Sequence, residues 1–344
     1  MGEDYAFVIG RIETELQRNI NGDVFILLNT VLYENFFSWE IVVEGKVILE
    51  IQFRSWKESE WEYKFLEDFY KINWEKKFPK IEEQRAEQLE SNSAFIEALE
   101  KDTLAFIKNA FPLLTPDEKN LPLVYFSGGK ESMVMHKILK NGKIKSQLLF
   151  ASVGLDFPDD VEFIKGLAVD KEFLSGDPIY LEIADKERAW KTLKEKGVLK
   201  VHDMWCRSEL KYPSRNKAVE TVYGDREYIA LEGSRKYEND FRRGHPMVNF
   251  ISDIKGYRNS KQVWLHPLAF WNGFDIWAYI FSHNVKINPL YYKGFHRTTC
   301  WMCPLVNPFH LRQSLKYGKE LWGGVDELEF EKAYEAFSQW NNPF

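Results

Sequence analysis

The chain has 344 residues, of which 44% are hydrophobic and 28% charged, and its formal net charge is −6. This composition is that of a globular protein with enough apolar side chains for a large core. Because the net charge is negative, the protein as a whole lacks the positive potential that would attract duplex DNA or an acidic membrane. Local clusters of basic residues can still hold phosphates. No apolar run reaches the roughly 18 residues of a membrane span, and the N-terminus lacks a signal-peptide pattern. The sequence therefore predicts a cytoplasmic protein.

Residues 1–115 are predicted to form an N-terminal β-rich and helical appendage. Short alternating runs flank Glu44 and Gly45, a pattern typical of a β-hairpin. From about residue 62 to residue 111, apolar residues recur at helical spacing. The segment FPLLTPDEKNLP, with three prolines, then indicates the domain boundary.

Residues 116–344 are predicted to form an α/β domain. Helical segments separate five short apolar runs, which are LPLVYF, SQLLFASV, DPIYLEI, EYIALEG and QVWLHPL. Strands that alternate with helices predict a doubly wound, mainly parallel, Rossmann-like sheet with helices on both faces. Ligands of such sheets bind at the carboxyl ends of the strands, so we expect functional residues there.

The turn at residues 127–132, SGGKES, joins the first of these strands to a helix. Glycines leave backbone amides uncovered at the helix N-terminus, and the lysine adds a cation, so the turn can bind an anion. The alternative is that the glycines only permit a tight turn. The spacing fits neither a Walker loop nor GxGxxG. The expected phosphate-binding residues are Ser127, Gly128, Gly129, Lys130, Glu131 and Ser132.

This loop closely resembles the SGGxDS loop of the PP-loop superfamily, with Glu131 in place of the usual aspartate. That superfamily, also called adenine nucleotide alpha hydrolase-like, includes ATP pyrophosphatases and phosphoadenosine phosphosulfate (PAPS) reductases. Further segments resemble the PAPS reductase family in the same order, and together they cover residues 121 to about 311. They are GLDFPDD, MWCRSELKYPSRNKAV, LEGSRKYENDFRRG and HPLAFWNGFDIWAYIFSHNVKINPLYYKGFHRTTCWMCP.

The resemblance implies that the loop grips the pyrophosphate of ATP or the phosphates of a sulfonucleotide (PAPS or APS), and that Gly154 belongs to the nucleotide site. It also implies that Arg235 faces the phosphate or sulfate end, where a guanidinium can clamp an oxyanion bidentately. Lys130 and Arg235 are therefore the expected catalytic residues, neutralising the departing charge together with Mg²⁺. Further basic candidates are Lys211, Arg242, Arg243 and Arg297.

Three cysteines are too few, and odd in number, for a secreted disulfide framework. Cys300 and Cys303 form a CxxC pair, and the resemblance implies that the fold brings Cys206 near them. Three thiolates can ligate a 4Fe-4S iron–sulfur cluster and leave one iron open for sulfur or substrate. Together with His202, the same thiols would instead form a zinc site. A redox pair, or buried cysteines without metal, are the remaining interpretations.

The leading functional hypothesis is an enzyme of sulfur metabolism that binds ATP, adenylates an acceptor with release of pyrophosphate, and delivers sulfur at a centre of Cys206, Cys300 and Cys303. The alternative is a PAPS or APS reductase that releases sulfite. Such reductases place a nucleophilic cysteine in a C-terminal tail motif, and no cysteine follows Cys303.

A third hypothesis, a non-catalytic nucleotide-binding module, draws on four departures from the family pattern, which are Glu131, Ser152, Val153 and Asn239. The partners expected are an adenine nucleotide and a protein that donates sulfur or electrons. A tRNA-binding surface would have to lie on the N-terminal appendage, and the net charge disfavours it. Homo-oligomer formation is left open.

Overall fold

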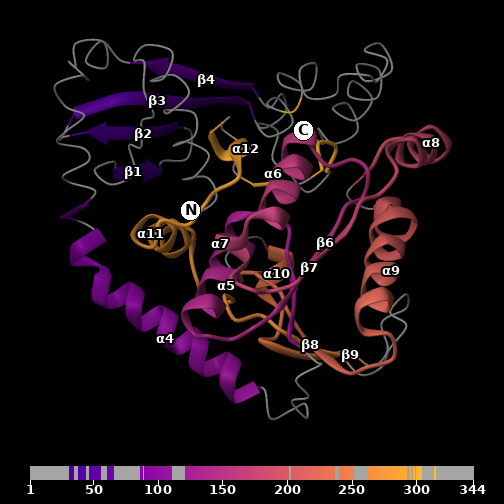
Figure 1. The fold of residues 1–344 in the computed structure, drawn as a ribbon. Coiled ribbons are helices and arrows are strands. Elements are labelled where there is room, and N and C mark those ends of the chain that lie inside the picture. Colours follow the sequence, from indigo (N-terminus) through magenta and orange to yellow (C-terminus); the bar gives the residue numbers. More distant parts are fainter. Residues whose placement is uncertain are drawn as a thin grey trace.

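The structure is a computed structural model, and Figure 1 shows that it contains two separate sheets. Within the described residues, no helix combines the length and the apolar character that crossing a membrane requires. The described residues are 31–34, 38–43, 46–55, 60–65, 86–87, 89–110, 121–200, 203–236, 240–251, 262–292, 295, 297–298, 300–303 and 314.

The N-terminal sheet is antiparallel, and its strands are paired in chain order. The strands are β1 Val31–Glu34, β2 Ser38–Val43, β3 Lys46–Ser55 and β4 Glu60–Phe65. β2 and β3 confirm the predicted strands on either side of Glu44 and Gly45, which themselves lie outside the described residues. The helical prediction was wrong for residues 62–65, because Trp61, Tyr63 and Phe65 alternate with charged residues at the period of a strand.

The helical part of the predicted appendage contains α4, Ser93–Ala110. Its buried Ile96 and Ile107 belong to the main hydrophobic core of the chain. The Thr103 hydroxyl on this helix accepts a hydrogen bond of 3.1 Å from the indole N–H of Trp271. Helix α4 therefore shares a core with the α/β unit. The predicted boundary falls on residues 111–120, outside the described part of the chain.

The second sheet has six strands in the order β7-β6-β5-β8-β10-β9. All neighbouring strands are parallel except β9, which runs antiparallel to β10. The five predicted apolar runs form the parallel strands, which confirms the mainly parallel α/β fold. The edge strand β9 was not predicted, because its four residues carry no clear alternation. The strands are β5 Leu123–Tyr125, β6 Gln147–Ala151, β7 Ile179–Glu182, β8 Tyr228–Leu231, β9 Val248–Ile251 and β10 Gln262–Leu265.

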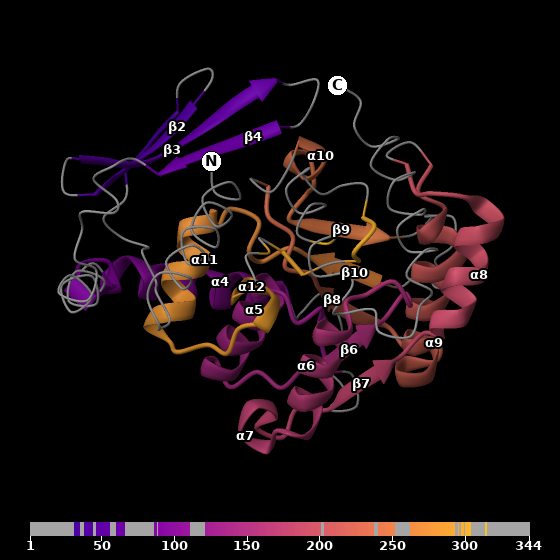
Figure 2. The same cartoon turned by 90° about the horizontal axis from the view of Figure 1, so that it is seen from above.

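Helices cover both faces of this sheet (Figures 1 and 2). Alternate strand residues point to opposite faces. Thus Val124 packs in the core with α5 and α11, while Leu123 packs in the cluster with α9. Helices α5, α6, α7, α11 and α12 lie on the first side, and α8 and α9 on the second. Their bounds are α5 Lys130–Asn141, α6 Pro158–Val169, α7 Lys171–Leu174, α8 Lys186–Lys196, α9 Tyr212–Tyr223, α11 Gly273–Ser282 and α12 Pro289–Tyr292; a π-helical turn Arg207–Lys211 precedes α9, and α10 is Asp240–Arg243.

The strand order reverses between β5 and β8. From β5 the chain moves outward through β6 to β7, and it then returns to place β8 on the other side of β5. The loops that leave β5 and β8 therefore diverge at the carboxyl edge of the sheet. In open α/β sheets a ligand binds in the crevice at such a reversal. The SGGKES loop follows β5, so the fold places it at this point.

Candidate nucleotide-binding site

The loop after β5 has a backbone that needs glycine. Gly128 has φ of +70°, and a Cβ there would lie 2.3 Å from Cδ1 of the buried Ile164. Both the left-handed conformation and the close approach of Ile164 disfavour a side chain at this position. Gly129 then adopts an extended conformation and contributes no side-chain cap, and α5 starts at Lys130. The first turn of α5 thus opens toward the crevice without an Asp or Ser cap in front of it.

Hydroxyl groups hold this loop in shape. The backbone N–H of Lys130 donates to the hydroxyl of Tyr291 at 2.9 Å, from α12. The Ser132 hydroxyl donates to the carbonyl of Gly129 at 2.9 Å, and the N–H of Gly129 donates to the Ser127 hydroxyl at 3.3 Å. In this structure the Tyr291 oxygen therefore accepts the amide hydrogen bond that an oxyanion could accept.

Glu131 lies between the two predicted catalytic cations. Its Oε1 is 3.0 Å from Nζ of Lys130, and 2.9 Å and 3.1 Å from Nη2 and Nε of Arg235. Burial alone would raise the pKa of Glu131, but the charges of Lys130 and Arg235 outweigh burial and lower this pKa to about 2. The Arg235 side chain is 1% exposed. The structure thus places Arg235 in direct contact with the carboxylate of Glu131.

Gly233, in the loop after β8, allows the two loops to approach each other. A Cβ at this position would lie 2.8 Å from Cβ of Glu131 and 3.2 Å from its carbonyl carbon. Such a distance is shorter than real Cβ contacts allow, so a larger residue would push the loops apart. Sequence reasoning missed Gly233, although a glycine directly after a predicted strand was the available signal.

A cavity of about 290 Å³ opens at the carboxyl ends of β5, β6 and β8. This volume is near the lower end of the range for small-molecule sites. The predicted residues that line the cavity are Ser127, Gly129, Lys130, Glu131, Ser132, Lys211, Arg242, Arg297 and Cys300. The predicted residues placed outside its lining are Gly128, Gly154, Arg235, Arg243, Cys206 and Cys303.

One wall of the cavity is apolar and aromatic, and it comes from three strands. Its residues are Tyr125, Phe126, Leu149, Phe150, Ala151 and Trp264. Arg215 from α9 also lines the cavity and is 6% exposed. Its guanidinium carbon lies 5.0 Å from the ring centre of Tyr212 and 5.7 Å from that of Trp264, within cation–π range. No motif pointed to Arg215, since only the packing of α9 on the sheet brings it here.

Gly154 lies in the turn after β6, where its N–H contributes to a set of donors around the carboxylate of Asp156. Asp156 accepts hydrogen bonds from the Ser152 hydroxyl at 2.8 Å and from the N–H groups of Val153 and Gly154 at 2.8 Å and 3.2 Å. Burial raises the pKa of Asp156 despite these donors. Burial and the neighbouring Asp156 also raise the pKa of Asp160 well above its usual range. Both carboxyl groups line the cavity.

The three cysteines form no disulfide with one another and are half-buried. Sγ of Cys300 lies 4.0 Å from Oδ1 of Asp156. Burial, reinforced by Cys303, raises the pKa of Cys206 to about 11. Burial, Asp156 and the other two cysteines raise the pKa of Cys300. Cys206 and Cys300 pack against the same hydrophobic cluster, and the N–H of Cys303 donates to the carbonyl of Cys300 at 3.1 Å, so the fold brings the three cysteines into one neighbourhood.

The arrangement of these thiols does not by itself form a metal centre. Among the residues that the structure describes, no three His, Cys, Asp or Glu side chains lie close enough together to hold a metal ion. His202, the fourth ligand of the zinc hypothesis, lies outside the described residues. The iron–sulfur and zinc hypotheses therefore stay predictions.

A doubly wound α/β fold with a glycine-containing loop at the reversal of strand order is an architecture in which many proteins bind their ligands at that loop. The profile of the phosphoadenosine phosphosulfate reductase domain matches residues 122–306, which is more than half of the chain. The chain belongs to this family.

Several known proteins are similar to the chain. An uncharacterized protein of Methanocaldococcus jannaschii is 30% identical over 258 residues, covering 74% of this chain and 58% of that protein. A second one from the same organism is 26% identical, covering 71% and 48%. The adenosine 5'-phosphosulfate reductase of Anoxybacillus flavithermus is 25% identical, covering 59% and 79%. The chain thus spans about half the length of the two archaeal relatives. The crystal structure of a PAPS reductase from Candida auris, a phosphate complex, aligns with a TM-score of 0.44 at 18% identity, covering 60% of this chain and 95% of that one.

Proposed function

We propose that this chain is an enzyme of the sulfonucleotide reductase kind, which binds an adenine nucleotide at the SGGKES loop and acts on a sulfonate group next to Cys300. One observation carries the proposal. A single cavity is lined by the loop, by basic side chains from distant segments and by a thiol. The relatives of the chain include proteins named adenosine 5'-phosphosulfate reductase, and this likeness supports a sulfonucleotide as the substrate.

Each wall of the cavity suits one part of such a substrate. The apolar strand ends that include Phe150 and Ala151 offer a surface for the adenine ring. Lys130 and the first amides of α5 suit the 5'-phosphate. Lys211 and Arg297, which line the same cavity as Cys300, suit the terminal sulfonate.

In the proposed reaction, the Cys300 thiol passes its proton to the carboxylate of Asp156, whose Oδ1 lies 4.0 Å from Sγ, while its sulfur attacks the sulfonate sulfur and a thiosulfonate forms. The bond between that sulfur and the bridging oxygen breaks, and the nucleotide leaves with a 5'-phosphate whose charge Lys130 stabilises. A dithiol donor then attacks the Cys300 sulfur, releases sulfite and is itself oxidised to a disulfide, which balances the two electrons. A thiolate bound to iron could not act in this way, so Cys300 has either this role or a ligand role.

The experiment is an anaerobic incubation of the protein with APS or PAPS. We expect sulfite release with dithiothreitol, and without it a sulfonate adduct on Cys300 that mass spectrometry detects. Cys300→Ser should abolish both, and Lys130→Ala should slow sulfite release by about a hundredfold. Cys206→Ser is the matched thiol control. Sulfite release that survives Cys300→Ser would overturn this mechanism.

A second candidate function is ATP-dependent adenylation with release of pyrophosphate, coupled to sulfur transfer. The observation that favours it is the ionised carboxylate of Glu131, a residue of the loop that lines the cavity. Carboxylate oxygens are preferred ligands of Mg²⁺, which accompanies ATP. Release of pyrophosphate from ATP that depends on an added acceptor, with no sulfite from APS or PAPS, would establish this function in place of the first.

A further inference from the structure

One carboxylate of the cavity has no task in the proposed reaction. Glu232 directly follows β8, and its N–H donates to the carbonyl of Leu265 in β10 at 3.0 Å, so the sheet fixes its backbone. Its side chain lines the cavity and is 31% exposed. Glu232 is therefore held at the carboxyl end of the sheet with its side chain accessible to a ligand.

The loop that begins with Glu232 packs closely against the SGGKES loop. Gly233, the next residue, lies so near Glu131 that an added Cβ would be 2.8 Å from Cβ of Glu131. Nη2 of Arg235, two residues further on, lies 2.9 Å from the carboxylate of Glu131. These two contacts fix the place of Glu232 relative to the first turn of α5.

Glu232 is an acidic side chain among basic ones. Its Oε2 lies 4.0 Å from Nδ1 of His266. Burial alone would raise the pKa of Glu232, but neighbouring positive charge, chiefly that of Arg242, outweighs burial and lowers this pKa. Arg242 and Lys211 line the same cavity. At neutral pH, Glu232 is therefore ionised, and its charge opposes that of the two cations.

An ionised carboxylate is unfavourable in a cavity for an anionic nucleotide unless the nucleotide offers it hydrogen-bond donors. Like charges that face each other across a binding site lower affinity, so Glu232 repels phosphate and sulfonate groups. The donors of an adenosine nucleotide are the exocyclic amine of adenine and the ribose hydroxyls. One of these must face Glu232 if the carboxylate is to favour binding.

The order of the strands selects the ribose hydroxyls. Strand β5 lies between β6 and β8, so the ends of β6 and β8 are about 10 Å apart, twice the spacing of neighbouring strands. The proposed surface for adenine, at Phe150 and Ala151, belongs to β6. The proposed phosphate site at α5 follows β5. The ribose joins these two groups, and its 2'- and 3'-hydroxyls are the donors that can point toward β8.

We propose that Glu232 accepts hydrogen bonds from the ribose hydroxyls and thereby selects nucleotides with a free 2',3'-diol, such as APS, over PAPS, which carries a phosphate on its 3'-hydroxyl. The inference rests on the proposed function and names the substrate of the same site. In dinucleotide-binding folds a carboxylate binds the ribose 2'-hydroxyl, whereas an arginine accommodates a 2'-phosphate. The same chemistry applied to the 3'-position makes Glu232 a specificity-determining residue.

The test compares AMP with adenosine 3',5'-bisphosphate, which differ only in the 3'-phosphate and bind without turnover. Calorimetry measures both affinities for the unmodified chain and for two variants. Glu232→Gln removes the charge, and Glu232→Asp keeps the charge but withdraws it by one methylene group. The matched control is Glu195→Gln, at an exposed position of α8. Thermal unfolding shows whether each variant is folded.

We expect the unmodified chain and Glu195→Gln to bind AMP at least about tenfold more tightly than the bisphosphate, because the 3'-phosphate faces a carboxylate. Glu232→Gln should lose this preference, since Lys211 and Arg242 then face the 3'-phosphate without the opposing charge. Glu232→Asp should still reject the bisphosphate. Replacing AMP by 3'-deoxy-AMP should weaken binding to the unmodified chain about tenfold, and should have little effect on binding to Glu232→Asp.

Equal binding of AMP and the bisphosphate by the unmodified chain would overturn the proposal, as would a preference that Glu232→Gln leaves intact or the absence of binding by either nucleotide. Failure of the proposed function has a different signature, which is a chain that prefers AMP but releases no sulfite from APS with dithiothreitol. Conversely, equal rates of sulfite release from APS and PAPS would support the proposed function and overturn the role of Glu232.

Discussion

The guanidinium of Arg235 holds one carboxylate oxygen of Glu131 through two nitrogens, Nη2 at 2.9 Å and Nε at 3.1 Å. Arg235 follows β8 and Glu131 is in the first turn of α5, so this contact ties together the two loops that flank the reversal of strand order. The same oxygen lies 3.0 Å from Nζ of Lys130. The conformation of Lys130 therefore depends on Glu131, and that of Glu131 on Arg235.

Arg235→Met should lower the free energy of unfolding by about 3 kcal/mol at pH 7, because it leaves a buried carboxylate with one cation instead of two. The pKa of Glu131, about 2 in the folded protein, lies below its usual 4.5. Its contribution to stability is therefore present above pH 4.5 and is lost as the pH falls toward 2. The variant should lose part of this acid dependence in urea unfolding. A double variant with Glu131→Gln should recover stability, and equal losses in single and double variants would contradict the pairing.

Gly128→Ala should destabilise the fold by about 2 to 4 kcal/mol, because the new Cβ meets Ile164 and the backbone conformation disfavours a side chain. Gly166→Ala is the control, since Gly166 lies in α6 with nothing within 4 Å of an added Cβ. This control should gain about 1 kcal/mol through helix propensity. Urea unfolding measures both changes, and a neutral Gly128→Ala would show that the loop does not need this conformation.

Tyr291→Phe should cost about 1 to 2 kcal/mol, because it leaves the buried N–H of Lys130 without its hydroxyl acceptor. With millimolar ADP present the loss should be smaller, since a phosphate oxygen can accept from the same amide. Thermal unfolding of both proteins with and without ADP tests this. An identical loss under both conditions would mean that the nucleotide does not reach the N-terminus of α5.

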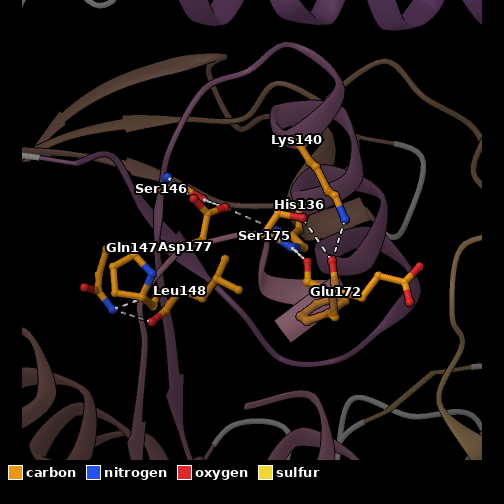
Figure 3. A network of polar contacts seen from close by, with 10 residues as sticks. His136, Lys140, Ser146, Gln147, Leu148, Glu172, Ser175 and Asp177 are labelled. Atoms are coloured by element: carbon orange, nitrogen blue, oxygen red, sulfur yellow. Dashed lines mark hydrogen bonds and ion pairs between the residues drawn. The ribbon is translucent and has the colours of Figure 1, made fainter. Parts of the chain in front are cut away.

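A buried polar network around His136 and Asp177 predicts the effect of acid on stability (Figure 3). Nε2 of His136 lies 3.0 Å from the carbonyl of Phe173, and Nδ1 lies 3.6 Å from Oδ2 of Asp177. Burial lowers the pKa of His136 below 6.5, although Phe173 and Asp177 oppose this effect. The folded state therefore binds fewer protons than the unfolded state, and stability should fall as the pH drops through 6.5.

His136→Gln should reduce this slope, which urea unfolding at pH 7.5 and pH 5.5 would measure. His266, whose pKa burial also lowers, contributes in the same direction and keeps part of the slope. Asp177 acts in the opposite sense at lower pH, because burial raises its pKa and its protonation then favours the folded state. Asp177→Asn separates the two effects. A slope that is the same with and without His136 would show that its protonation does not limit stability.

Cys206 should react slowly with iodoacetamide in metal-free protein. Its pKa of about 11, raised by burial and by Cys303, leaves about a hundredfold less thiolate at neutral pH than a pKa of 9.0 would. The rate is measured by mass spectrometry of the labelled residue at pH 7.5, with an unfolded sample as the reference. Equal rates in the folded and unfolded samples would contradict the burial of this thiol.

The iron–sulfur hypothesis has a test of its own, since the thiols share one neighbourhood. Anaerobically prepared protein should be brown and contain iron and acid-labile sulfide, and Cys206→Ala should lose the colour. Zinc in place of iron and sulfide would establish the other metal hypothesis. Colourless protein without either metal would leave Cys300 available for the nucleophilic role proposed above.

The sequence alone predicted most of the parallel sheet. Alternation of apolar runs with helical segments is a local pattern, and each of the five runs became a strand. The order of motifs along the chain was also enough to identify the family, and the match to the domain profile confirms this identification. Trp271, Trp277 and Tyr279 were predicted to be core residues, and all three are buried. In contrast, β9 was missed because its four residues carry no clear alternation, and β4 was missed because its alternating residues were assigned to the helical stretch that follows them.

The local sequence determined where the chain forms strands and where the SGGKES loop lies. Hydrophobic periodicity and the placement of glycines are properties of neighbouring residues, so they can be recognised without the fold. Only the tertiary structure decided that Arg235 contacts Glu131, that Tyr291 accepts from the first amide of α5, and that Arg215 enters the cavity. The first two contacts join residues 104 and 161 positions apart in the chain. Which side chains meet across such separations depends on how sheet and helices pack, and no local pattern of residues contains that information.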